Sequence, residues 1–224
     1  MRTRRSPVLV LASSLLVGAG RAAAAGVPEP AGAARTAAAP VTAPASPATV
    51  ANLAEAYEAD VHARERYLAF AAQAAAEGQA RVAAVFRAAA RSEQIRAARH
   101  AEALRASGHE PVARPMPEVA ARTTRQNLLW MLAHEGAERG SAYPRYVQLA
   151  RREGHAGAVL TFTEAYRVET ELLKLYREAL ATLGSRGGGE PVHVCGGCGH
   201  VLRGQPPGAC PVCLSDGAGF LRVE

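Results

Sequence analysis

The sequence predicts a mainly α-helical protein, in which an antiparallel four-helix bundle is followed by a small metal-binding ribbon. Aromatic residues make up only 5% of the chain and alanine is abundant, which favours helices packed closely through small side chains over a β-sandwich. Between residues 51 and 184, long stretches of helix-forming residues end at single glycines, as helices commonly do. All four cysteines lie in the C-terminal segment, residues 192–224.

The N-terminus has the features of an export signal. Residues 1–5 are basic, residues 7–20 form an apolar run, and residues 22–25 are small. The run is shorter than the ~20 residues that span a bilayer, so we expect residues 1–25 to be a signal peptide that is cleaved from a periplasmic or otherwise exported protein. Residues 3–6 resemble a twin-arginine export motif, although Pro7 stands where a bulky apolar residue is usual. An ordinary signal peptide that contains two arginines is the alternative.

A linker is expected between this signal and the bundle. Residues 26–50 contain five prolines among Ala, Thr and Gly. Such a composition does not bury enough apolar surface to fold by itself, so we expect a disordered tether.

Four helices are expected within residues 51–184. Their predicted bounds are residues 52–77, 79–107, 119–153 and 155–183, each followed by a glycine or preceded by one. A proline-containing loop joins the second helix to the third, and Pro144 is expected to kink or break the third. Residues 185–191 are expected to link the bundle to the ribbon.

Each predicted helix carries a carboxylate on its apolar face. The five acids are Asp60, Glu93, Glu135, Glu138 and Glu169. A carboxylate in an apolar interior is costly unless a cation compensates its charge, and acids from all four helices are typical of a carboxylate-bridged di-metal centre. The alternative is a small error in helix phase, with the acids in surface salt bridges. Glu164 and Glu171 fall off the apolar face and are expected to be solvated.

The C-terminal cysteines form two C-x-x-C pairs, Cys195 with Cys198 and Cys210 with Cys213. Two such turns can hold one metal ion in a tetrahedron of thiolates, and two disulfides are the alternative. The pattern resembles the rubredoxin-like ribbon, which holds one iron and transfers one electron at a time. Zinc ribbons share the spacing, so zinc is also possible on these residues alone.

The bundle and ribbon together resemble rubrerythrin over residues 51–224. The matching segments are Ala63-Arg64-Glu65-Arg66-Tyr67, His134-Glu135-Gly136-Ala137-Glu138 with Tyr143-Pro144, Ala150-Arg151-Arg152-Glu153-Gly154, and the four-cysteine ribbon. The resemblance implies a ferritin-like di-iron bundle that reduces hydrogen peroxide to water with electrons relayed by the ribbon iron. It also implies a homodimer, in which the ribbon of one chain lies near the bundle of its partner.

The resemblance assigns the di-iron ligands to the same five acids. It makes Glu93, Glu135, Glu138 and Glu169 the catalytic carboxylates, with Asp60 as the shorter counterpart of a glutamate. Both histidine ligands of the family are replaced, one by Arg96 and the other by Leu172.

These replacements leave two states open for the bundle. An arginine stays protonated and is not a metal ligand, but its charge can serve as a counter-ion for carboxylates. The bundle is then either a weakened or single-metal site that still reduces peroxide, or a metal-free salt-bridge cluster around Arg96. In the second case the protein is a one-electron carrier or an interaction module whose ribbon is held together by zinc. His100 is a possible substitute ligand.

Four further residues near the predicted site are expected to have minor roles. His62 and His134 are expected at the surface or behind the ligands. Tyr67 and Tyr143 are expected either to hydrogen-bond the centre or to fill the core.

Charge and composition disfavour several other functions. The net charge is +6, but no arginine-rich run with interleaved aromatic residues suggests a nucleic-acid surface. Iron storage is disfavoured, because a ribbon is not needed for it and no second acidic cluster is evident. The expected partners are hydrogen peroxide and an unidentified electron donor, without stable membrane insertion after signal cleavage.

Overall fold

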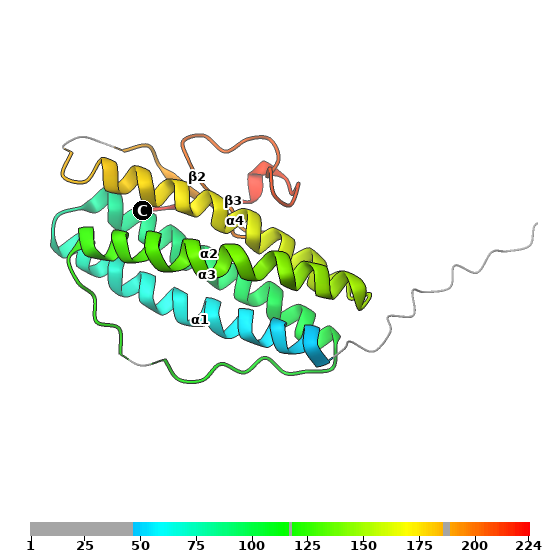
Figure 1. Cartoon of the computed structure of the whole chain (residues 1–224). Coiled ribbons are helices and arrows are strands. Elements are labelled where there is room, and N and C mark those ends of the chain that lie inside the picture. The colour runs from blue at the N-terminus through cyan, green and yellow to red at the C-terminus, as the bar shows by residue number, and fades with distance from the viewer. Residues whose placement is uncertain (1–46, 117, 186–188) are drawn as a thin grey trace, which may run out of the picture. The chain divides into compact units, whose positions relative to one another are not determined.

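The structure, a computed structural model, describes residues 47–116, 118–185 and 189–224, which belong to one compact unit. Its helices are α1 (Pro47–Ala76), α2 (Ala80–Ala106), α3 (Thr124–Arg152) and α4 (Ala156–Ala181), followed by β1 (Val192–Cys195), β2 (Val201–Arg203), the 3₁₀ turn η1 (Gly217–Gly219) and β3 (Phe220–Val223) (Figure 1). The predicted signal peptide and most of the predicted linker lie outside the described residues. Because α1 already begins at Pro47, the linker ends before residue 50.

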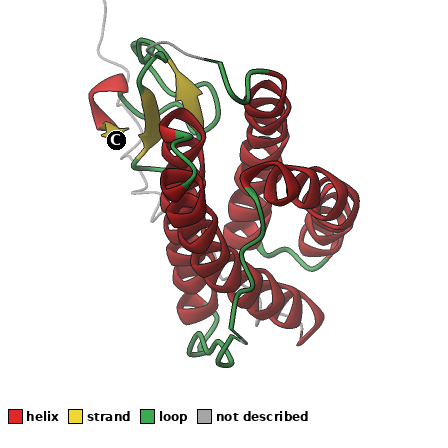
Figure 2. Ribbon diagram, turned by 90° about the vertical axis from the view of Figure 1, so that its left-hand side faces the viewer, coloured by secondary structure: helices red, strands yellow, loops and turns green. Residues whose placement is uncertain are grey.

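Neighbouring helices of the bundle run antiparallel. α1 packs along α2 and α3 along α4, while contacts of α2 with α4 and of α1 with α3 close the ring (Figures 1 and 2). The connection from residue 107 to residue 123 runs back along the bundle, so α3 begins beside the end of α1. There the backbone N–H of Thr124 donates to the carboxylate of Glu77 at 3.0 Å. The predicted four-helix bundle is therefore confirmed, with a long crossover between its second and third helices.

The third helix differs from its prediction at two places. It begins at Thr124 rather than near residue 119, because Thr123 and Gln126 form a capping box. It also continues through Pro144, so the predicted break is wrong. Pro144 is exposed, whereas its neighbour Tyr143 is buried against the bundle. Packing on the buried side thus outweighs the one backbone hydrogen bond that the proline removes.

The burial of side chains on α1 and α2 differs in character from that on α4. On α1 and α2 the large apolar residues Leu53, Tyr67, Val82 and Phe86 are buried. On α4, however, Tyr166 is 41% exposed and Glu164 is buried. Since Arg99 of α2 lies 3.3 Å from Glu164, an interhelical ion pair offsets the burial of this acid. The prediction that Glu164 is solvated is wrong.

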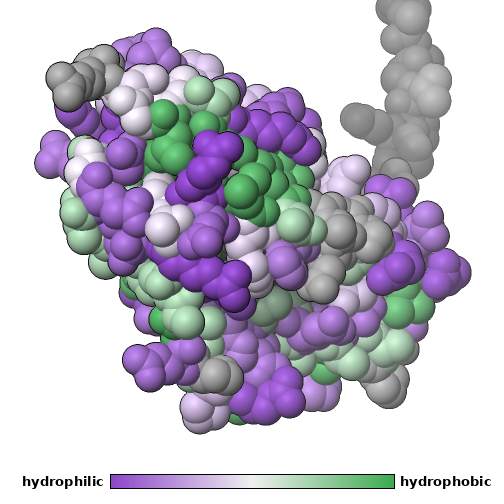
Figure 3. Space-filling view, turned by 60° about the vertical axis from the view of Figure 1, so that its left-hand side comes forward, coloured by the Kyte–Doolittle hydropathy of each residue, from purple (hydrophilic) through white to green (hydrophobic). Residues whose placement is uncertain are grey.

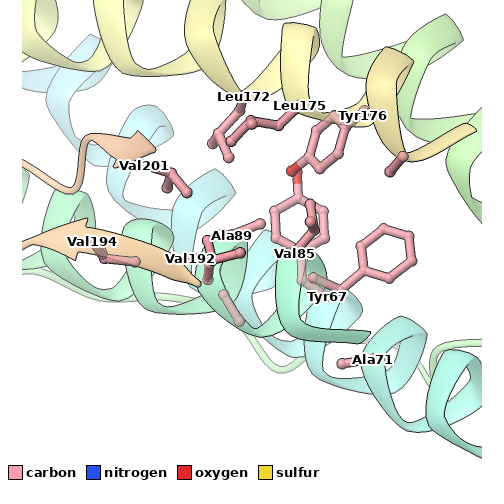
Figure 4. Close-up of a cluster of buried hydrophobic side chains, with 14 of the residues drawn as sticks. Tyr67, Ala71, Val85, Ala89, Leu172, Leu175, Tyr176, Val192, Val194 and Val201 are labelled. Atoms are coloured by element: carbon pink, nitrogen blue, oxygen red, sulfur yellow. The ribbon is translucent and has the colours of Figure 1, made fainter. Parts of the chain in front are cut away.

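The ribbon is a three-stranded antiparallel sheet in the order β2-β1-β3. It packs on α2 and α4, and its apolar residues join the main hydrophobic core of the bundle. Figure 4 shows Val192, Val194 and Val201 of the sheet facing α2 and α4. The two predicted parts of the protein therefore share one core.

The face of the molecule in Figure 3 is mostly hydrophilic. In Figure 3, hydrophobic residues on one face form small groups that are separated by hydrophilic ones. Large exposed apolar side chains, such as Leu68, Leu160 and Leu214, come from different elements. None of the described helices combines the length and apolar character needed to cross a membrane.

Candidate metal centres

The four ribbon sulfurs converge as one metal-binding group. Cys195 and Cys213 are 3.7 Å apart between their Sγ atoms, as are Cys198 and Cys210. All four ligand atoms lie within 4.8 Å of one another. A tetrahedron with metal–sulfur bonds of about 2.3 Å has sulfurs about 3.8 Å apart, whereas a disulfide needs about 2.05 Å. The predicted metal site is present, and the cysteines are not paired as disulfides.

Hydrogen bonds in the ribbon stabilise the anionic form of the Cys195 sulfur. Burial opposes ionisation of Cys195, but the hydroxyl of Ser215 and the backbone N–H groups of Cys198 and Gly197 lower its pKa to about 7. Ser215 Oγ lies 3.3 Å from the sulfur of Cys195 and 3.1 Å from that of Cys213. Because metals bind thiolates rather than thiols, these donors favour metal binding at Cys195, whereas burial raises the pKa values of Cys198 and Cys210. Sequence reasoning missed Ser215, which lies two residues after the second C-x-x-C pair.

The bundle centre is organised around Arg96 rather than around a ligand set. Its Nη1 donates to Glu169 at 2.8 Å, and its Nη2 donates to Asp60 at 3.1 Å and also to Glu93. The Arg96 side chain is 2% exposed. Three of the five predicted acids thus converge, from α1, α2 and α4, and they converge on a guanidinium.

The electrostatics of this cluster keep Arg96 charged. Burial alone would lower the pKa of Arg96, but attraction by Asp60, Glu93 and Glu169 raises it well above its usual value. Each carboxylate in turn has an oxygen engaged by an N–H group. The cluster is therefore a buried network of charge-assisted hydrogen bonds.

His100 supports the cluster from the next turn of α2. Its Nε2 lies 3.5 Å from the second oxygen of Asp60, and its Nδ1 lies 3.1 Å from Thr161 Oγ1. The ring stacks on Tyr143, with 6.2 Å between centroids. His100, the possible substitute ligand, therefore lies beside one of the predicted acids.

The remaining predicted residues divide into three groups. Glu135 and Glu138 belong to α3, but their side chains lie outside the described residues. His134 is exposed and stacks on Trp130, and His62 contacts the backbone of Arg114. Tyr67 is 1% exposed and its ring contacts Tyr176 edge-on.

Leu172 occupies the position of the second histidine ligand of the family. It is buried in the hydrophobic cluster between bundle and ribbon, and Figure 4 shows it beside Leu175, near Val201 of β2. The position serves apolar packing, and it supplies no nitrogen ligand.

The ribbon docks beside the carboxylate cluster. A Cβ atom built on Gly199 would lie 2.9 Å from the backbone oxygen of Ser92, the residue before Glu93. On the other side, Arg167 of α4 donates to the backbone oxygens of Val212 and Pro211 at 3.1 and 3.2 Å. The first cysteine turn therefore rests on α2 and the second is held by α4. Sequence reasoning did not identify either contact.

Comparison with known proteins agrees with this architecture. The rubrerythrin family model matches residues 51–180. The chain belongs to the rubrerythrin family. It is 28% identical to nigerythrin of Nitratidesulfovibrio vulgaris over 75% of this chain and 82% of the relative, and 29% identical to rubrerythrin of Porphyromonas gingivalis over 77% and 88%. Solved nigerythrin structures, including a fully reduced, all-ferrous state, match with TM-scores of 0.70 to 0.71 and 27% identity over 78% of this chain and 86% of theirs.

Membership in this family bears out the expectation of a non-haem iron oxidoreductase. The four thiolates suit either iron or zinc by their chemistry, and the family favours iron at the ribbon. The bundle centre, unlike the ribbon, has an arginine among its candidate metal ligands. Asp60, Glu93 and Glu169 are engaged by Arg96, and among the described residues no group besides the cysteines brings three ligand atoms together. With Arg96 bound to them, these three described acids do not have the arrangement of a two-metal centre, while the side chains of Glu135 and Glu138 lie outside the described residues.

We expect Cys210→Ser to abolish metal binding at the ribbon, because it removes one thiolate of the tetrahedron. Metal bound at the ribbon, measured by elemental analysis together with the thiolate absorption, should fall from about one ion per chain to nearly none. Ser215→Ala is the matched control, since it removes a hydrogen bond to two sulfurs but no ligand. Equal metal content in Cys210→Ser and the unaltered protein would contradict the assignment.

Proposed function

We propose that the protein is an exported peroxide reductase of the rubrerythrin type. Cys195, Cys198, Cys210 and Cys213 would hold an iron ion that would accept electrons from an external donor, and hydrogen peroxide would be reduced at the bundle. Family membership supports this activity. The observation that carries the proposal is a four-thiolate site that packs directly on α2. Its first cysteine turn contacts Ser92, the residue before the buried Glu93.

Different residues of the chain have different roles in the proposed reaction. Bound iron supplies one-electron transfer, and reduction of one peroxide to two waters takes two electrons and two protons. The cysteines hold the metal, and the N–H and hydroxyl donors around them stabilise its negative ligands. Gly199 and Arg167 fix the ribbon against the bundle, which sets the distance over which an electron moves. His100 and the carboxylates beside it can hold protons at the centre.

A second function is favoured by the Arg96 cluster. If the guanidinium replaces metal ions altogether, the bundle is a rigid support and the ribbon is a one-electron carrier, or a zinc-stapled interaction module. In this case electrons pass to a partner protein and not to peroxide. The motivating observation is the engagement of Asp60, Glu93 and Glu169 by one arginine.

The peroxide proposal is tested by reducing the purified protein anaerobically and adding hydrogen peroxide. We expect the ribbon absorption of ferric iron to return at a rate that rises with peroxide concentration. Cys210→Ser, which lacks the chromophore, and an equal amount of free iron provide the backgrounds. Reoxidation no faster than with free iron would reject peroxide reduction and leave the electron-carrier function.

The docking of the ribbon generates a second test. Gly199→Ala should slow peroxide-dependent reoxidation by roughly tenfold or more, because the added methyl collides with Ser92 and shifts the ribbon on α2. Gly204→Ala is the matched control. Gly204 has a similar positive φ of 81°, against 83° at Gly199, but its Cβ would meet only the side chain of Glu190. Equal rates in the two variants would show that the contact with α2 does not set electron transfer.

Export and dimerisation are also part of the proposal. The basic, apolar and small-residue segments within residues 1–25 support cleavage of a signal peptide, with the twin-arginine route favoured by residues 3–6. We expect the protein in the periplasmic or secreted fraction to begin near residue 26, as measured by N-terminal sequencing. Light scattering of the same sample should give twice the mass of one mature chain. A cytoplasmic protein with residues 1–25 intact would contradict export.

A further inference from the structure

The bundle centre contains a positive charge that belongs to the chain itself. We infer that Arg96 takes the place of at least one metal ion of the two-metal centre, so that this bundle holds at most one ion where a rubrerythrin holds two. The inference rests on the family assignment and on the geometry of Arg96. It does not depend on which electron acceptor the protein uses.

Position and charge both support the substitution. The guanidinium lies among carboxylates contributed by α1, α2 and α4, where a bridging cation would otherwise be needed. Its planar fork reaches all three at once, as a bound ion would. Because arginine does not lose its proton in proteins, the charge is permanent and repels a second cation from the same position.

Arg96 offsets one of the three negative charges of Asp60, Glu93 and Glu169 when all are ionised. These three acids therefore need less positive charge from metal than they would without the guanidinium. The absence of a ligand at Leu172, which packs towards the ribbon, removes a coordination site as well.

Displacement of Arg96 by metal is the competing explanation. A guanidinium that left the carboxylates would have to find other partners for its charge. Around Glu93 and Arg96, the buried face of α2 is otherwise composed largely of alanines, such as Ala89 and Ala97. Such a move would therefore bury an unpaired charge, which is strongly unfavourable.

The inference is tested by counting metal ions in the full-length mature protein. Unaltered protein and Arg96→His are loaded with ferrous iron without oxygen, freed of loose metal by gel filtration, and analysed for iron per chain. The ribbon ion is determined separately from its thiolate absorption and subtracted. We expect the unaltered bundle to retain no more than one ion, and Arg96→His to retain about one more than the unaltered protein.

Two further variants control for nonspecific effects and for folding. Arg99→His changes an arginine on the next turn, whose side chain is 32% exposed and paired with Glu102 and Glu164, and should gain no iron. Arg96→Lys keeps a positive charge and should also gain none. If Arg96→His does not fold, the count on the unaltered protein and on Arg96→Lys still decides.

The outcomes are distinct. Two bundle ions in the unaltered protein would overturn the inference, as would a folded Arg96→His that gains no iron, or an equal gain in Arg99→His. Thermal melting gives an independent readout, because added ferrous iron should raise the melting temperature of Arg96→His more than that of the unaltered protein. Loss of peroxide reduction alone would count against the proposed function and would leave this inference intact.

Discussion

The hydrogen-bonded cluster of Arg96 with Asp60, Glu93 and Glu169 determines how the bundle is built. Carboxylates from three helices meet in an interior that is otherwise apolar, and this arrangement is stable only with a cation between them. Whether the cation is a metal or a side chain decides the chemistry. A metal ion supplies open coordination positions and redox states. A guanidinium supplies a positive charge and oriented hydrogen-bond donors, but neither a coordination position nor a redox state.

The members of such a cluster depend on one another. Removing one partner of a buried ion pair costs about 3–5 kcal/mol, because the remaining charge is left without compensation. A buried arginine in place of a histidine is therefore stable only if the acids are also present. The acids in turn are stable in the interior only if a cation is present.

Much of this architecture was predictable from local patterns, and the exceptions have identifiable causes. The glycines at the helix ends, the C-x-x-C pairs and the acids on apolar faces located the bundle, the ribbon and the convergence of Asp60, Glu93 and Glu169. α3 continues through Pro144 because its tertiary packing overrides the local preference of proline to end a helix, and a kink at this position stays a prediction. Glu164 was misjudged because its partner, Arg99, lies on another helix. Long-range partners of this kind leave no signature in the spacing of residues along one helix.

The docking of the ribbon links the two sites and accounts for the second missing histidine. Gly199 packs on Ser92, next to Glu93, and Leu172 fills the apolar space between α4 and the sheet. A histidine at position 172 would bring a polar ring into that cluster, at the cost of burying its second nitrogen. Leucine instead strengthens the contact that holds the ribbon beside the carboxylates. The same substitution that removes a metal ligand from the bundle thus stabilises the attachment of the site that retains its metal ligands.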